Sequence, residues 1–245
     1  MGLTLYYMGI SHPSNAARLM LDYKGLAYRR VDVRPGFQPF STRLHGFSKI
    51  TVPALELDAQ RIQGSCAIAQ ALEQRKPDPS LYPSDPQLRA AVQEAESWDE
   101  RALQPVPRHL FRWALISKPA VLESFVSDFQ RLRPAKLVAK LQARPLARFI
   151  GATGVNDERV RADMRALPGM LEHVRELLDT GVLGSEQPNA ADFQIATTLR
   201  AMDALEDLQG LLEDRLCSYA RFIWPETELH LPSVLPPDWL PQHQR

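Results

Sequence analysis

Residues 51–72 read TVPALELDAQRIQGSCAIAQAL and contain two short β-favouring runs followed by a helical pattern. The runs Val52–Leu57 and Arg61–Ile62 are separated by Asp58-Ala59-Gln60, a spacing that predicts an antiparallel hairpin. Ser65 is then expected to cap a helix whose apolar side chains face inward. These inward positions are Ile68, Ala69 and Leu72. The stretch therefore predicts a β-β-α unit.

A β-α-β unit is predicted on the N-terminal side of this stretch. Leu3–Met8 is a compact β-favouring run, and Ser14 and Asn15 offer caps for a helix after it. Tyr28–Val33 alternates polar and apolar residues and predicts a second strand. Two strands joined through a helix run parallel. Residues 34–48, rich in Pro, Gly and Ser, are expected to form a loop.

The chain changes character after the second unit. Residues 76–86 carry four prolines, which block regular structure and suit a linker, and helical patterns dominate beyond them. We expect an α/β domain in residues 1–84, an all-helical domain in residues 85–224 and a proline-rich tail in residues 225–245. The tail also carries apolar residues, so we expect it to pack in extended form across the helical domain. These residues are Leu229, Leu231, Val234, Leu235 and Trp239.

Prolines divide the expected helices of the second domain. Residues 88–104 predict a helix that Pro105 ends. Residues 119–149 predict helical structure with interruptions at Pro134 and Pro145. Each proline is expected to break or bend its helix because it lacks a backbone N–H.

Two patterns locate the core of the second domain. Apolar residues between 160 and 178 recur every three or four positions and form one helical face, which Pro168-Gly169 is expected to kink or break. Asn189 and Asp192 resemble a capping box, with Asp in place of the usual Glu, before another apolar helix. We expect that helix to be the buried centre of the domain.

Composition excludes several classes of protein. The chain has 245 residues, 44% hydrophobic and 24% charged, which excludes disorder as its dominant state. Lys+Arg and Asp+Glu number 29 each, so no net charge draws it to nucleic acid or anionic lipid. A local basic patch remains compatible with this balance. No apolar run approaches the roughly 18 residues of a membrane span, so neither nucleic acid nor a membrane is expected as a partner.

Cysteine and histidine usage argues against a metal site. Cys66 and Cys217 lie far apart without a C-x-x-C motif, so neither a disulfide framework nor a thiolate cage is expected. The histidines show no metal-ligand spacing. Residues 1–8 lack the basic flank of a signal peptide. We therefore expect a cytoplasmic protein without a bound metal.

One group of residues, in the first domain, has the features of a ligand-binding or catalytic site. The strand ending at Tyr7-Met8 is followed by the loop 9–14 and by a helix whose N–H groups would stabilise an anion bound at that loop. Pro53 heads a strand, where proline removes a ladder donor and indicates a special backbone geometry. Gly64-Ser65 offers a second helix N-terminus with a free hydroxyl.

The order of these elements resembles the cytosolic glutathione S-transferase superfamily over residues 3–222. Four motifs carry the resemblance: Val52-Pro53 at a strand start, Ser65 at a helix start, Tyr82-Pro83 in the linker and Asn189-x-x-Asp192 before the central helix. It implies a glutathione S-transferase fold, with a thioredoxin-like α/β N-terminal domain and an all-α C-terminal helical domain. It also implies a cis Val52–Pro53 peptide bond and, as a rule, a homodimer.

The resemblance further implies where a thiol is activated. In this superfamily the first loop holds the group that hydrogen-bonds the glutathione sulfur, a serine or cysteine in some classes and a tyrosine at the strand end in others. Ser11 falls at the serine position and Tyr7 at the tyrosine position. Ser11 is favoured because Ser11-His12-Pro13 is similar to the Ser-x-Pro pattern of the serine-type classes, and Tyr7 is the alternative.

The same resemblance implies a thiol-binding site. Val52, beside Pro53, resembles the residue whose backbone pairs with the cysteinyl part of glutathione in the manner of an added strand. Ser65 resembles the residue that binds the γ-glutamyl carboxylate. The family usually has Glu or Gln before this serine, whereas this chain has Gly64. Gln63 is then a substitute partner for the γ-glutamyl amino group, and another low-molecular-weight thiol stays open as the cosubstrate.

We therefore expect a transferase of the detoxification type that conjugates glutathione, or another small thiol, to a small hydrophobic electrophile. A thiol-dependent isomerase or dehalogenase is one alternative, and a non-catalytic binding or assembly module with the same fold is another. Thiol–disulfide reduction is disfavoured because the first loop has no cysteine. Phe111 and Trp113 lie where the family's substrate pocket often draws residues, although core packing is the expected role of each.

Overall fold

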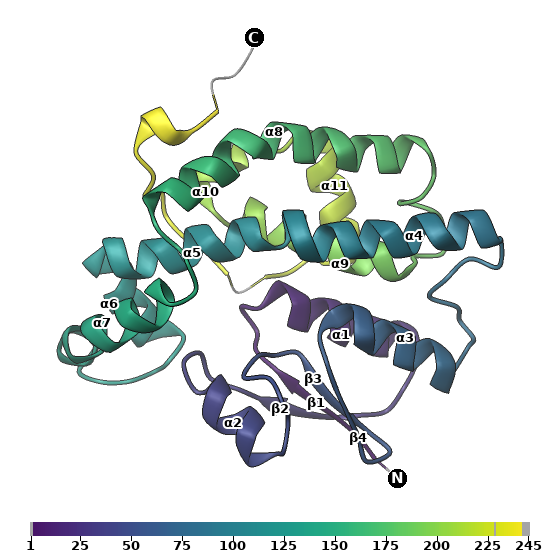
Figure 1. Ribbon diagram of the computed structural model, residues 1–245, viewed down its shortest axis with the longest axis horizontal. Helices are drawn as coiled ribbons and strands as arrows, with labels where there is room; N and C mark the ends of the chain where they lie inside the picture. The colour runs from purple at the N-terminus through teal and green to yellow at the C-terminus, as the bar shows by residue number, and fades with distance from the viewer. Residues whose placement is uncertain (1, 228, 242–245) are drawn as a thin grey trace.

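A four-stranded mixed sheet lies beneath a layer of helices in the computed structural model, which describes residues 2–227 and 229–241 (Figure 1). The strand order is β2-β1-β3-β4, with β1 parallel to β2 and β3 antiparallel to both of its neighbours. The predicted β-α-β unit and the hairpin are therefore both confirmed. The strands are β1 (Leu3–Tyr7), β2 (Arg29–Asp32), β3 (Ala54–Leu57) and β4 (Gln60–Gln63).

Two helices cover the face of the sheet that looks toward the rest of the molecule (Figure 1). They are α1 (His12–Tyr23) and α3 (Ser65–Arg75), which pack against each other. Both helices bury apolar side chains completely, because they lie between the sheet and the helices above it. The fully buried residues include Ala16, Ala17, Met20, Leu21, Ile68, Ala69 and Leu72.

Three local predictions in this part of the chain are wrong. Residues 34–48 contain a helix, α2 (Gln38–Leu44), whose Pro39 stands in the first turn, where no backbone N–H is needed. Ser11, and not Ser14 or Asn15, caps α1, because the strand ends early enough for the helix to begin at residue 12. Gly64 is the N-cap residue of α3, so Ser65 is already inside the helix.

The rest of the chain is helical, and residues 76–85 connect it to α3 without regular structure. Leu81 and Tyr82 of this connection are buried, and the Leu81 carbonyl accepts a hydrogen bond from the Ala190 N–H. The helices are α4 (Pro86–Trp98), the π-helical turn η1 (Asp99–Leu103), α5 (Pro105–Ser117), α6 (Pro119–Asp128), α7 (Ala135–Gly151), α8 (Asp157–Asp179), α9 (Ala190–Asp203), α10 (Glu206–Gln209) and α11 (Asp214–Ile223). This arrangement confirms the predicted fold class.

Prolines interrupt these helices less than predicted. Pro105 opens α5 directly after η1, and Figure 1 shows α4 and α5 as one continuous rod, because a first-turn proline lacks only an N–H that the helix does not use. Pro145 lies inside α7 at an exposed position, so the helix runs through it. Pro168 lies inside α8, whose buried stripe holds that helix together. The interruption at Pro134 is confirmed, since α7 begins after it.

The core of the second domain matches its prediction. The stripe from Val160 to Val174 is buried along α8, and nearly every residue of α9 is buried. Asn189 and Asp192 form the predicted capping box at the start of α9. Within residues 2–227 and 229–241, no helix has the length and apolar character needed to cross a bilayer.

The described residues of the tail pack over α9 and α10, in extended form as predicted except for a 3-10 turn, η2 (Pro237–Trp239). Leu231 forms a parallel bridge with Leu205. The Asp207 carboxylate accepts hydrogen bonds from the backbone N–H groups of Val234 and Leu235, at 2.8 and 3.0 Å. The apolar residues that the tail buries are Leu229, Leu231, Leu235 and Trp239.

The capping box gives a stability prediction. Asn189 Oδ1 accepts from the N–H groups of Ala191 and Asp192 in a buried setting, at 2.9 and 3.2 Å. Asn189→Ala is expected to lower the free energy of unfolding by about 2 kcal/mol, because no water replaces the lost acceptor. Asp85→Ala removes the exposed cap of α4 and is expected to cost about 0.5–1 kcal/mol. Urea unfolding measures both, and equal losses would contradict the buried role of Asn189.

Candidate functional site

Three segments meet at one end of the sheet. Tyr6 of β1 pairs with Ala54 of β3, and Ala54 pairs with Gln63 of β4, in antiparallel register on both sides. The C-terminal ends of β1 and β4 therefore lie on either side of the N-terminal end of β3. The predicted site residues adjoin these ends: Tyr7, Ser11, Val52, Pro53, Gly64 and Ser65.

Ser11 occupies the N-cap position of α1. Its backbone is extended, and its Oγ accepts a hydrogen bond from the Ser14 N–H at 3.4 Å. The Ser11 N–H is bound to the Met8 carbonyl at 2.9 Å, which closes the loop between β1 and α1. Because Oγ serves as an acceptor here, its own proton is left to be donated. The positive end of the α1 dipole lies at the same place.

Tyr7 and Asn15 hold the loop from the inside. The Tyr7 hydroxyl donates to Asn15 Oδ1 at 2.8 Å, and Asn15 Nδ2 donates to the carbonyls of Gly9 and Ser11, at 2.7 and 3.0 Å. Tyr7 is 8% exposed. The hydroxyl proton of Tyr7 is thus used within the protein. Asn15 was not predicted as a site residue, since a helical asparagine gives no signal of a loop contact.

His12 follows Ser11 into the buried space between α1 and α5. Burial, with a smaller effect of the positive charge of Arg108, lowers the pKa of His12 to about 3, against a hydrogen bond to the Gln104 backbone. The imidazole is therefore neutral at physiological pH. A neutral ring beside Ser11 adds no positive charge to the loop.

Val52 and Pro53 are joined by a cis peptide bond, as the resemblance implied. Within the described residues, the backbone N–H and carbonyl of Val52 have no hydrogen-bond partner, whereas the Pro53 carbonyl accepts from the Gly64 N–H at 3.2 Å. Gln63 holds the segment before Val52, because its side-chain amide bonds the backbone of Lys49 and Thr51. The Gln63 amide is thus used in the protein and is not free to replace a glutamate at position 64.

Gly64 has free space beside it, whereas the hydroxyl of Ser65 is already hydrogen-bonded within the protein. Gly64 has a φ of +99°, and a Cβ built there would meet no atom within 4 Å. Ser65 is 3% exposed, and its hydroxyl donates to Gln194 Oε1 of α9 at 3.0 Å. The Ser65 hydroxyl therefore ties α3 to α9 in this structure. The N–H groups of the first turn of α3 still point toward the sheet edge.

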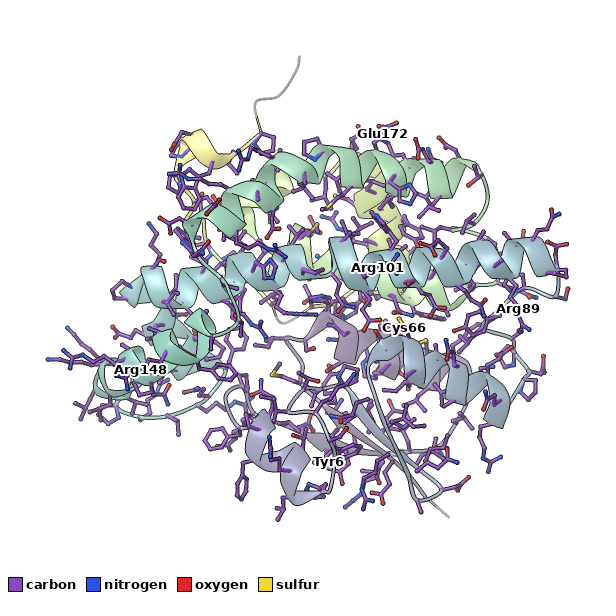
Figure 2. The ribbon with its side chains drawn as sticks, in the orientation of Figure 1. Tyr6, Cys66, Arg89, Arg101, Arg148 and Glu172 are labelled. Carbon is purple, nitrogen blue, oxygen red and sulfur yellow. The ribbon has the colours of Figure 1, made fainter. Side chains whose placement is uncertain are left out.

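A buried polar network continues from Ser65. Gln194 Nε2 donates to the carboxylate of Glu96, and the Cys66 thiol lies 3.1 Å from Gln194 Oε1. Burial and the neighbouring Glu96 charge raise the pKa of Cys66 well above its usual range, so this thiol stays protonated and inert. Figure 2 shows Cys66 where α3 faces the helices above it. Gln194 was missed because only tertiary packing brings it to Ser65.

Two half-buried arginines follow each other on α5, and the first of them interacts with His12. Arg108 acts on His12 and on Asp99, a fully buried carboxyl whose pKa burial raises to about 7. Arg112, one helical turn along, has no carboxylate partner in the described part of the chain. Burial lowers the pKa of Arg112 to about 10, with a smaller effect of Arg108, so it keeps its charge at neutral pH. Arg112 is thus a half-buried cation that an anionic ligand would pair.

An apolar pocket of about 130 Å³ lies between α5, α6 and the tail. Phe111 lines it with Phe125 and Phe129, and His230 and Leu231 close it from the tail. Trp113 is not part of it, because its buried indole donates to Asp157 and packs on Trp239. Among the described residues, no cluster of three His, Cys, Asp or Glu side chains has a metal-binding arrangement.

Glu96 gives a pH prediction. Burial raises the pKa of Glu96 to about 7, against the hydrogen bond from Gln194 that lowers it. The folded state therefore binds the proton more tightly than the unfolded state does. The stability that this provides is present below about pH 4.5 and is lost as the pH rises through about 7, a change of up to about 3 kcal/mol.

Glu96→Gln is expected to remove this pH dependence. Between pH 5 and pH 8, the free energy of unfolding of the variant, measured in urea, should therefore rise relative to that of the wild type. Glu94→Gln, at an exposed position of the same helix, is expected to follow the wild-type profile. If the two variants show the same pH profile, the burial effect on Glu96 is absent.

Residues 5–80 match the family model described as "Glutathione S-transferase, N-terminal domain". Maleylacetoacetate isomerase of Rattus norvegicus is 35% identical over 106 residues, which are 42% of this chain and 49% of the rat protein. The chain thus matches about half the length of this curated relative.

Solved structures share the whole two-domain fold. A beta-etherase from Sphingobium superposes with a TM-score of 0.64 at 19% identity, over 91% of this chain and 93% of that one. A maleylacetoacetate isomerase from Anaeromyxobacter dehalogenans with glutathione (GSH) bound in its active site superposes with a TM-score of 0.51 at 22% identity, over 91% and 88%. At these identities the likeness concerns the fold.

Proposed function

We propose that this chain, whose residues 5–80 match the glutathione S-transferase N-terminal domain, is an enzyme of the glutathione S-transferase superfamily that activates the thiol of glutathione, or of an analogue, at Ser11. The thiolate forms a carbon–sulfur bond to a small hydrophobic electrophile and displaces its leaving group, which departs with the electron pair of the broken bond, so the product is a thioether conjugate. The observation that carries this proposal is the position of Ser11 at the N-cap of α1, with its Oγ already accepting an N–H. Its proton is then directed to a thiolate, in a site of positive potential.

The contacts of Tyr7 favour Ser11 over the alternative. The Tyr7 hydroxyl donates to Asn15, and breaking that bond to reach a thiolate would leave a buried acceptor unpaired. Ser11 has no such competing acceptor for its proton. Tyr7 then acts as a positioning residue for the loop that carries Ser11.

The size of the activation can be calculated. A thiol with a pKa near 8.5 is about 3% ionised at pH 7, and lowering its pKa by about two units ionises about three-quarters of it. The lower basicity also reduces nucleophilicity by roughly eightfold. A net gain of about threefold remains, so most of any large rate enhancement comes from positioning the electrophile beside the sulfur.

The remaining parts of the thiol would be held at the sheet edge. The unpaired backbone of Val52 suits the cysteinyl part as an added strand, with Pro53 fixing the chain direction. The γ-glutamyl carboxylate would be bound by the first-turn N–H groups of α3, because the Ser65 hydroxyl is engaged by Gln194. Gly64 leaves room for a thiol with a larger group at that end.

We also propose a homodimer in the cytoplasm and no bound metal, in keeping with the superfamily resemblance. The domain boundaries at residues 84 and 224 are likewise part of this proposal.

Ser11 gives the central test. Ser11→Gly keeps most of the helix cap stability, within a few tenths of a kcal/mol, whereas Ser11→Ala loses about 1 kcal/mol. Both remove the hydroxyl, so both are expected to raise the pKa of the bound thiol toward about 8.5. The thiolate absorbance of bound glutathione at pH 7 should fall about 25-fold, and the rate at saturating thiol should fall only severalfold.

A variant of Tyr7 is the matched control. Tyr7→Phe is expected to leave the bound-thiol pKa unchanged while destabilising the loop. The reverse result, a normal pKa in Ser11→Gly and a raised one in Tyr7→Phe, would transfer the role to Tyr7. Thermal unfolding with glutathione and other thiols comes first, and no shift with any thiol would favour a non-catalytic binding module.

A second candidate is a thiol-dependent isomerase, favoured by the curated relative named maleylacetoacetate isomerase and by unpaired Arg112. In such an enzyme the thiolate adds to an activated double bond and leaves again after rotation, so glutathione is regenerated. A carboxylate of the substrate would pair with the Arg112 guanidinium.

Arg112→Gln separates the two candidates. An isomerase is expected to convert a cis unsaturated keto acid without consuming glutathione, and the variant should raise KM for it by about tenfold or more. Arg165→Gln, an exposed arginine of α8, should have no effect. Consumption of one thiol per turnover, with a neutral electrophile accepted and no response to Arg112→Gln, would identify conjugation.

A further inference from the structure

Most of the exposed large apolar side chains of the described residues lie on two segments of the chain. The described residues expose seven of them, and six belong to α2 with its N-cap residue or to α7. Figure 1 shows both helices at the same end of the molecule. The six are Phe37, Phe40, Leu44, Leu137, Leu141 and Phe149, with exposed fractions from 46% to 70%, and the seventh is Phe222 of α11.

The same two segments are basic and contain no acid. Residues 129–156 carry six Lys and Arg and no Asp or Glu, and residues 33–55 carry three and none. Since the whole chain has 29 of each sign, the remainder carries an excess of acid. The basic residues are Arg34, Arg43, Lys49, Arg131, Arg133, Lys136, Lys140, Arg144 and Arg148.

On α7 the cations and the apolar groups form adjoining stripes. Lys136, Lys140, Arg144 and Arg148 recur every four residues, and Leu137 and Leu141 stand one position after two of them. All of these side chains are exposed, and none of the four cations pairs with a carboxylate in the described residues. Figure 2 shows Arg148 at the outer end of the molecule. The opposite side of α7, with Ala139 and Ile150 buried, packs against α5 and α6.

The two segments touch, so they form one surface. Gln130 Nε2, just before α7, donates to the carbonyl of Pro35, just before α2, at 3.3 Å. A Cβ on Gly36 would come within 3.1 Å of the same Gln130 atom. Phe40 and Leu44 lie one turn apart on α2 and share a face. We call this surface, from residues 33–55 and 129–156, the α2–α7 face.

We propose that the α2–α7 face docks this protein peripherally onto an anionic lipid surface. Exposed Phe and Leu would enter the boundary between headgroups and acyl chains, and the flanking Lys and Arg would pair with the headgroup phosphates and carboxylates. A lipid interface is a partner that gains from both stripes of α7 at once. The net charge of zero is thus the sum of one basic surface, the α2–α7 face, and an acidic remainder of the chain.

Other kinds of partner would interact favourably with only the cations or only the apolar side chains of this surface. A second copy of the chain would bring two sets of unpaired cations together, which costs free energy. A nucleic acid would pair with the cations but leave six apolar side chains in water. A helical peptide needs an apolar groove, and neither of the two described pockets includes any of these six side chains.

The test is sedimentation with vesicles of phosphatidylcholine, with and without phosphatidylserine, using the full chain. The wild type is expected to bind only the anionic vesicles, more weakly as salt rises. Each cation near such a surface contributes about fivefold, so the double variant Lys140→Gln with Arg144→Gln should lose about 25-fold in affinity. Leu141→Ser should also weaken binding, by losing insertion.

Matched controls lie elsewhere on the surface. Arg165→Gln on α8 and Phe222→Ser on α11 change an exposed cation and an exposed apolar residue outside the α2–α7 face, and both should bind like the wild type. Thermal unfolding checks that all variants fold. No binding to anionic vesicles, or equal losses in the controls, overturns the proposal. A dimer that Leu141→Ser dissociates, without vesicle binding, assigns the face to a second copy and also overturns it.

Discussion

The antiparallel direction of β3 between β1 and β4 is the constraint on which the site depends. It places the start of β3 beside the ends of both neighbours, so three segments separated by up to 54 residues in the chain, from Ser11 to Ser65, reach one edge of the sheet. Two helices then begin at that edge and direct their N–H groups toward it. Without this direction, the helix N-termini of α1 and α3 would stand at opposite ends of the sheet.

Hydrogen-bond satisfaction decides which groups at this edge remain available to a ligand. Tyr7 and Ser65 both carry hydroxyls in the right region, but one donates to Asn15 and the other to Gln194. Ser11 differs because its oxygen accepts and its proton is not used. Of these three hydroxyls, that of Ser11 is the least buried and is the one left for chemistry.

Acidic and basic side chains gather in different parts of the structure. Acidic groups such as Glu96 and Asp99 are taken into the space between α4 and α9, where burial raises their pKa values. On the α2–α7 face, cations collect that form no ion pair with a carboxylate among the described residues. A net charge of zero therefore conceals an uneven distribution of charge over the molecule.

The sequence by itself determined the order of strands and most helices, the hairpin and the capping box, because these follow from local periodicity and caps. The cis bond at Val52–Pro53 was implied only by the family resemblance. The sequence failed for Pro145, which lies inside α7, for a break at Pro168, because α8 runs through it, and for α2, hidden among prolines and glycines. Only the tertiary structure decided that Ser65 is bound to Gln194, 129 residues away, and that Pro35 meets Gln130. Such contacts arise from packing of distant elements, for which neighbouring residues carry no signal.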